Sequence, residues 1–356
     1  MRLARDLHPV AWWVWAIGLA AYATNTTNPW LLLLLVGVAT VVVAARRGDQ
    51  PWARSFRLYL GIGAAIVVIR VVFHIVFGGA PGRVLVDLPA IPLPHWVLGI
   101  TLLGPLTREG LLSGLYDGLR LAAIVICLGA ANALANPKRL LRSVPPALYE
   151  IGTALVVAVT VLPQLADSVQ RVRRAQALRA APQVRRTGRL RRFLVPVLED
   201  ALERSLALAA GMDTRGYGRS GTAGRAERRV TGALMLAGLV GLCMGTYAVL
   251  DQTTPRWLAG PMVVAGLVLC VAGLWLAGRR VERSIYRPDP WRWPEAVVVA
   301  TGVVVGYGGW WLAHHRVLIA YPGVSSAPQV SLLALAAVLV GLVPALAAPA
   351  PRVALA

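Results

Sequence analysis

The stretch "ALYEIGTALVVAVTVLPQLADSVQRVRRAQALRA", Ala147 to Ala180, joins an apolar half to an arginine-rich half. A hydropathy window would count Ala147 to Leu165 as a membrane span, because a helix of about 20 apolar residues can cross a bilayer core. The second half carries arginines at positions 171, 173, 174 and 179. Whether the first half crosses the membrane sets the side on which these arginines lie, and this choice decides the fold.

The composition of the chain is that of an integral membrane protein. Of 356 residues, 57% are hydrophobic and 15% are charged, and the mean hydropathy is +0.63. Soluble domains are less apolar than this. The formal net charge is +20, and in a membrane protein such an excess is typical of cytoplasmic loops that follow the positive-inside rule. We predict an all-α polytopic membrane protein with about eight transmembrane helices and a cytoplasmic region of amphipathic helices.

Eight runs are apolar and free enough of charge to be predicted spans. They are Val10 to Thr24, Trp30 to Ala45, Leu58 to Phe77, Gly110 to Ala135, Val230 to Leu250, Trp257 to Ala277, Ala296 to Ala313 and Val330 to Ala348.

The distribution of arginines between the two sides of the membrane argues against Ala147 to Leu165 as a ninth span. If it crossed, residues 166 to 229 would lie outside, although they hold 15 arginines against 6 acidic residues. Basic residues near span ends mark the cytoplasmic side. If the segment does not cross, every basic cluster lies inside and both termini are cytoplasmic. We therefore expect an N-terminal transmembrane domain at 1–135, a cytoplasmic domain at 136–229 and a C-terminal transmembrane domain at 230–356.

Two amphipathic helices are predicted in the cytoplasmic domain. An apolar stripe follows each helix at spacings of three and four residues, which is the period of one helix face. Asp200 and Arg204, four residues apart, form a supportive pair, and Pro196 suits a first helical turn. The stripes consist of Leu162, Leu165 and Val169 on the first helix and Leu198, Leu202 and Leu206 on the second.

Each of these helices is expected to end on an arginine. The first stops before Pro182, because the residue preceding a proline is disfavoured in a helix, and this leaves Arg179 in the last turn. The second stops at Gly216, a favourable left-handed cap, and this leaves Arg215 at its end. A cation at a helix C-terminus also compensates the helix dipole, which is an alternative reason for both arginines.

The two arginine ends resemble the coupling motifs of the transmembrane T component of energy-coupling factor (ECF) transporters, of the cobalt and vitamin uptake permease family. In that motif a small residue, an arginine and a small residue end each helix. Thr214, Arg215 and Gly216 match it, whereas Leu178, Arg179 and Ala180 match it more loosely, because Leu178 is not small. The stretch from Thr107 to Pro145 is also similar to the central span of the family and its following short helix.

The resemblance implies a coupling subunit that is not itself an enzyme. Its cytoplasmic coupling domain would dock Arg179 and Arg215 on two ATP-binding ABC subunits. The apolar stripes would contact a substrate-binding S component. ATP-driven motion would then drive uptake of a vitamin or a transition-metal ion through the cell membrane. The resemblance names neither the substrate nor the S component.

Other functions are weighed on the residues. Lys138 is the only lysine, and its surroundings "ANPKRLL" are no Walker A loop, so the chain is not expected to hydrolyse ATP itself. A membrane-embedded enzyme could use Glu109, Asp117 and Arg120, although an ion pair between Arg70 and Asp117 is the structural alternative.

No cofactor, metal or nucleic acid is predicted as a ligand. The three cysteines show no paired spacing. No aromatic residue interleaves with the basic cluster before Phe193, which argues against nucleic acid. Membrane lipid is an expected partner of some of these arginines.

Overall fold

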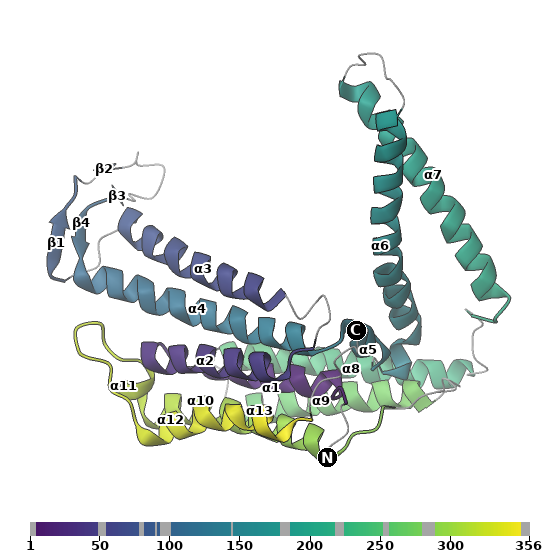
Figure 1. Ribbon diagram of the computed structural model, residues 1–356. Helices are drawn as coiled ribbons and strands as arrows, with labels where there is room; N and C mark the ends of the chain where they lie inside the picture. The colour runs from purple at the N-terminus through teal and green to yellow at the C-terminus, as the bar shows by residue number, and fades with distance from the viewer. Residues whose placement is uncertain are drawn as a thin grey trace. The chain divides into compact units, whose positions relative to one another are not determined.

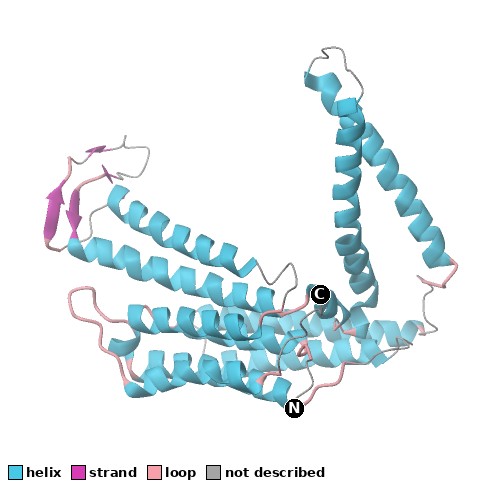
Figure 2. Ribbon diagram, viewed as in Figure 1, coloured by secondary structure: helices cyan, strands magenta, loops and turns pink. Residues whose placement is uncertain are grey.

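The computed structural model describes residues 5–48, 55–77, 82–89, 91–92, 101–143, 145–178, 186–217, 224–251, 256–279 and 289–349. Helices dominate these ranges (Figures 1 and 2). The chain divides into two compact units, one of residues 1–140 with 288–356 and one of residues 141–287. The helices of the predicted C-terminal domain are found in both units. The three-domain division stays a prediction about function.

The first unit consists of helices that pack on one another. Thr107 begins α4 by accepting the Gly110 backbone N–H at 3.1 Å, and Asn28 begins α2 in the same way by accepting from Trp30. The helices are α1 (Pro9–Thr24), α2 (Pro29–Arg46), α3 (Phe56–Val76), α4 (Arg108–Leu134), α5 (Pro137–Arg142, which leads into the second unit), α10 (Trp293–His315), α11 (Val317–Ala320), α12 (Leu332–Leu339), η4 (Val340–Leu342) and α13 (Val343–Ala347).

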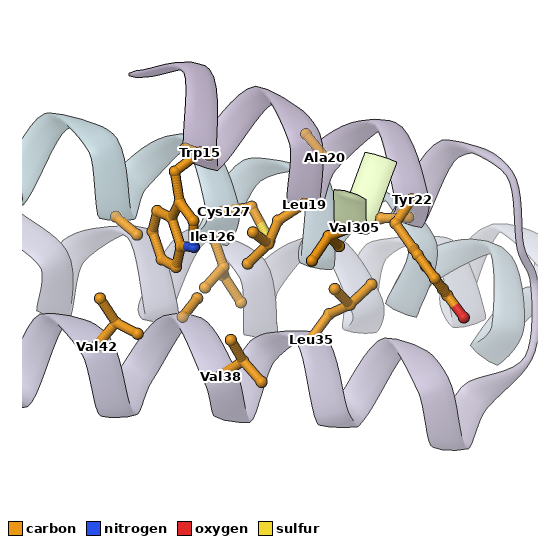
Figure 3. Packing of buried hydrophobic residues seen from close by; sticks show 14 of the residues in the cluster. Trp15, Leu19, Ala20, Tyr22, Leu35, Val38, Val42, Ile126, Cys127 and Val305 are labelled. Carbon is orange, nitrogen blue, oxygen red and sulfur yellow. The ribbon is translucent and has the colours of Figure 1, made fainter. Parts of the chain in front are cut away.

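The core of this unit is built around α1. Figure 3 shows Trp15 and Leu19 of α1 packed among side chains of α2, α4 and α10. Both residues are fully buried. The helix that the sequence places first is therefore the centre of the unit.

Two small antiparallel ribbons lie in the connection between α3 and α4. β1 (Val84–Asp87) pairs with β4 (Pro105–Thr107), and β2 (Ile91–Pro92) pairs with β3 (Thr101–Leu102). The strands adjoin the ends of α3 and α4 in Figure 2.

The second unit contains two helical hairpins. Its helices are η3 (Pro146–Leu148), α6 (Tyr149–Leu178), α7 (Arg186–Asp213), α8 (Arg225–Leu250) and α9 (Arg256–Arg279). α6 contacts α7, and α8 packs along α9. The α8–α9 packing is close because a Cβ on Gly266 would lie 2.5 Å from the Leu242 backbone nitrogen. Small residues commonly let membrane helices approach in this way.

Seven described helices are long and apolar enough to cross a membrane: α2, α3, α4, α6, α8, α9 and α10. Six of them match predicted spans. The other two predicted spans, α1 with 16 residues and the run Leu332–Ala347, are shorter. A 16-residue helix is about 24 Å long, against a bilayer core of about 30 Å. The all-α polytopic membrane fold is confirmed, and the two shortest predicted spans differ from the other six only in length.

α6 meets the same criteria of length and composition from Glu150 to Leu178. Helix length and composition therefore do not separate a spanning α6 from one that lies on the cytoplasmic side. The expectation that Ala147 to Leu165 does not cross rests on the arginine distribution and stays a prediction.

Candidate coupling site

The first predicted amphipathic helix and the apolar segment before it are one helix, α6, from Tyr149 to Leu178. Pro163 lies inside this helix. A proline in a helix interior cannot donate to the carbonyl four residues earlier, and it bends the helix axis. The apolar half and the arginine-rich half therefore belong to one rod.

The second predicted helix begins earlier than we expected. α7 begins at Arg186, so Pro196 lies in its interior and not in its first turn. The prediction for Pro196 is wrong because the arginine-rich residues before it, which are good helix formers, extend the helix toward its N-terminus. α6 and α7 thus both carry an interior proline.

The C-terminal end of α7 is a Schellman cap. Gly216 has φ +76°, the left-handed conformation that favours glycine. The Tyr217 N–H donates to the Met212 carbonyl at 3.1 Å, and the Gly216 N–H donates to the Asp213 carbonyl at 2.9 Å. These two bonds define the motif and place Arg215 at the C-cap position. The left-handed cap predicted from the sequence is confirmed.

Arg215 is exposed at this cap, as is Thr214 before it. Within the described residues, no ion pair or hydrogen bond engages the Arg215 guanidinium group. The helix dipole favours a cation at this position. The cap therefore presents one planar donor group to the surroundings.

The other predicted tip is described only up to Leu178. Leu178 is 89% exposed at the end of α6. Arg179 and Ala180 lie outside the described residues. Their role in a second tip stays a prediction.

A carboxylate near the middle of α7 holds this helix to the C-terminal half of α6. The Ser168 hydroxyl of α6 donates to the Asp200 carboxylate of α7. Arg171 of α6 lies 3.3 Å from this carboxylate, and Arg204 of α7 lies 3.1 Å from it. The Ser168 hydroxyl above all, with the two guanidinium groups, holds the pKa of Asp200 below its usual range. Asp200 therefore stays ionised at neutral pH and bridges the helices.

The sequence indicated only part of this cluster. The pair of Asp200 and Arg204 was predicted from its spacing and is confirmed. Ser168 and Arg171 were not predicted as its partners, since they lie about thirty residues away along the chain. A polar Ser168 next to apolar stripe positions was the available signal.

The side chains of the apolar stripe of α7 are exposed. Leu198, Leu202 and Leu206 are 58%, 63% and 69% exposed. On α6, Leu162 is exposed, whereas Leu165 and Val169 are partly buried. Within this hairpin, most of the predicted contact stripe is available to a partner.

A family model described as "Cobalt transport protein", CbiQ, matches residues 1–223, which is more than half of the chain. The chain belongs to the CbiQ family. A curated relative is the energy-coupling factor transporter transmembrane protein EcfT of Leuconostoc gelidum subsp. gasicomitatum. It is 26% identical over 196 residues, which make up 50% of this chain and 67% of the relative. The resemblance inferred from the arginine-tipped helices is thus confirmed at the level of the family.

The match to the CbiQ model contains α6, α7 and the Arg215 cap, and it ends before α8. The family and the relative point to a component of a membrane transporter. The helices α8 to α13 lie beyond the matched residues.

Glu109 and Arg120, two residues of the enzyme alternative, bond to different parts of this CbiQ-family chain. The Glu109 carboxylate accepts the Arg83 backbone N–H at 2.7 Å at the start of α4. The Arg120 guanidinium group donates to the Thr24 carbonyl at the end of α1. Among the described residues no ion pair connects Glu109, Asp117 and Arg120.

The suggested ion pair between Arg70 and Asp117 is wrong. Neither residue takes part in any of the ion pairs among the described residues. A Cβ on Gly118 would lie 3.2 Å from the Arg70 Cβ, so Arg70 does face α4 at this level. α3 is held on α4 by such close packing at glycines rather than by a salt bridge.

Proposed function

We propose that the chain is the coupling subunit of an ECF-type importer. It joins two ATP-binding ABC subunits to a membrane-embedded S component, and it transmits the ATP-driven motion of the former to the latter. The cargo, a vitamin or a transition-metal ion, is set by the S component. The membership in the CbiQ family and the relative named EcfT support this class of function.

The observation that carries the proposal is the Arg215 cap. A planar guanidinium group at the end of a rod suits a bidentate contact with a carboxylate on a partner. Gly216 stops the helix by its left-handed conformation and so fixes where Arg215 lies. Thr214 and Gly216 keep the tip narrow, which lets it enter a groove. Arg179, between Leu178 and Ala180, has the same role at the end of α6.

The apolar stripes complete the mechanism. Leu198, Leu202 and Leu206 of α7 are exposed, and with Leu162, Leu165 and Val169 of α6 they provide the contact for the S component. Asp200 holds the two helices together, so a displacement of one tip is shared by both rods. The motion of the ATP-binding subunits thereby reaches the stripe.

The proposal is tested on the tagged full-length chain, purified from a membrane that also contains its partners. Arg215→Ala and Arg179→Ala are each expected to weaken retention of the ATP-binding subunits. If each arginine is buried against a carboxylate on docking, its removal costs about 3–5 kcal/mol, or roughly a hundredfold to several thousandfold in affinity. The double variant should lose these subunits and keep the S component, as measured by quantitative mass spectrometry.

Arg189→Ala and Arg192→Ala are the matched controls, because they remove the same charge from α7 away from its tip. They should retain both kinds of partner. Equal losses from tip and control variants would mean that Arg215 and Arg179 contribute only general positive charge on the cytoplasmic side. The proposal would then lose its basis. ATP hydrolysis by the purified chain free of other proteins would contradict it as well.

A further inference from the structure

Residues 289–349, which we call the C-terminal segment, are bound by side chains from the first fifth of the chain. We infer that this segment is a permanently docked lateral partner of the family region. It covers one face of α1 and the adjoining edge of α2, and it closes this face to any membrane-embedded protein. We call the covered surface the docking face and define it by Trp15, Gly18, Tyr22, Asn28 and Arg46.

The docking face holds the segment by its backbone. Trp15 Nε1 donates to the Gly341 carbonyl at 3.1 Å inside the core. Arg46 donates through Nε and Nη2 to the Ala345 carbonyl at 3.0 and 2.6 Å. The Gly341 carbonyl lies in η4, three residues before Pro344, which has no N–H to donate. The Ala345 carbonyl lies in the last turn of α13, where carbonyls lack a helical donor. The donors of the docking face satisfy them.

Asn28, which lies between α1 and α2, also binds backbone carbonyls of the segment. Its side-chain amide donates to the Ile319 and Gln329 carbonyls at 3.0 and 2.8 Å. Its Oδ1 accepts the Trp30 N–H at 3.2 Å. Asn28 is fully buried, so all three bonds are made without competition from solvent.

Ion pairs fix the segment where it begins. Arg5 lies 2.8 Å from the fully buried carboxylate of Glu295. Arg139 of α5 donates to Asp289. Removing one partner of a buried ion pair strongly destabilises the fold, because the other charge is left buried without a partner. The start of the segment is therefore bound to the family region as well as its end.

Backbone contact between α1 and α10 leaves no room for another molecule. A Cβ on Gly18 would lie 2.0 Å from the Gly302 carbonyl oxygen, and a Cβ on Gly309 would lie 2.6 Å from the Tyr22 Cα. Neither a lipid chain nor a side chain of a partner fits between such helices. The contact is thus of the kind that small residues build between membrane helices.

The consequence rests on the proposed function. The S component must meet this chain elsewhere than on the docking face, since the C-terminal segment occupies that face throughout the transport cycle. The matched family residues end at 223, so the occupant is supplied by the part of the chain beyond them.

A disulfide between α1 and α10 tests the inference in the full-length complex. A Cβ on Gly306 would lie 3.8 Å from the Ala21 Cβ, which is the usual separation in a disulfide of about 3.8 Å. In a background with Cys127, Cys243 and Cys270 replaced by alanine, Ala21→Cys with Gly306→Cys should crosslink completely on mild oxidation. The oxidised complex should retain its S component and its ATP-binding subunits, and its ATP hydrolysis should equal that of the reduced complex.

Two results would overturn the inference. One is no crosslink under conditions in which both thiols react with a small maleimide. The other is a crosslink that releases a partner or stops ATP hydrolysis, because the segment would then have to move. The crosslink is read on the chain itself, so a chain that crosslinks but never brings ATP-binding subunits contradicts only the proposed function.

A pair of point variants tests the recognition of the backbone. Asn28→Asp keeps the acceptor for Trp30 and replaces the two amide donors by a buried anion that faces two carbonyls. It should increase protease cleavage between residues 317 and 331 and lower the yield of the crosslink. Gln329→Ala leaves the accepting carbonyl in place and should change neither. Equal behaviour of the two variants would contradict recognition through backbone carbonyls.

Discussion

At the scale of the residue, Gly216 decides where the tip of α7 ends. Its φ of +76° is strained for a residue with a side chain, so Gly216→Ala is expected to cost about 1–2 kcal/mol at the cap. Hydrogen exchange of residues 212–217 should become faster, and retention of the ATP-binding subunits should fall between that of the unmodified chain and Arg215→Ala. Gly216→Asn is the control, because asparagine tolerates the left-handed region. Equal effects of alanine and asparagine would refute a conformational role of this glycine.

At the scale of the element, Asp200 joins α6 to α7. Removal of the carboxylate by Asp200→Ala takes away the acceptor of Ser168 and the partner of two arginines, so the helices should separate. Spin labels on cysteines at the exposed positions 167 and 199 would report a wider distance distribution. Glu203→Ala, an exposed acid one turn further, should leave the distribution narrow.

The same contact has an expected pH dependence. The folded pKa of Asp200 lies below its usual value, so its stabilising effect is complete above the unfolded pKa of about 3.9 and is lost as the pH falls through the folded pKa. The distance between the labels should therefore be constant from pH 8 to pH 5. A change within this window would show that the bridge is not the ionised carboxylate.

At the scale of the whole molecule, the side of the membrane on which α6 lies is open to a direct test. The arginine distribution predicts that residues 147–229 are cytoplasmic, although α6 is long and apolar enough to span. In a chain without its native cysteines, single cysteines at Asp167, Gln183 and Ser220 should react with an impermeant thiol reagent only after the cytoplasmic face is opened. Labelling of these cysteines from outside intact cells would refute the topology and place the coupling domain on the wrong side for ATP.

Local patterns were sufficient for much of this protein. The apolar runs predicted the all-α membrane fold and six of the spanning helices. Gly216 predicted the cap, and the four-residue spacing predicted the pair of Asp200 with Arg204. These features depend on neighbours within a turn or two of helix, so they can be inferred from the sequence alone. The predicted pair of helices that end in arginine was also sufficient to indicate the family.

Tertiary contacts decided the rest. Arg186 to Phe193 continue the helix through Pro196, which no cap signal indicated. The last apolar run is short and bound by its carbonyls to residues some three hundred positions earlier, such as Trp15 and Arg46. Ser168 meets Asp200 only because α6 and α7 fold into a hairpin. Hydropathy, spacing and capping residues determined which segments are helical. The surface against which each helix packs depended on close contacts at glycines and on hydrogen-bond donors far away in the chain. No local sequence pattern encodes such long-range contacts.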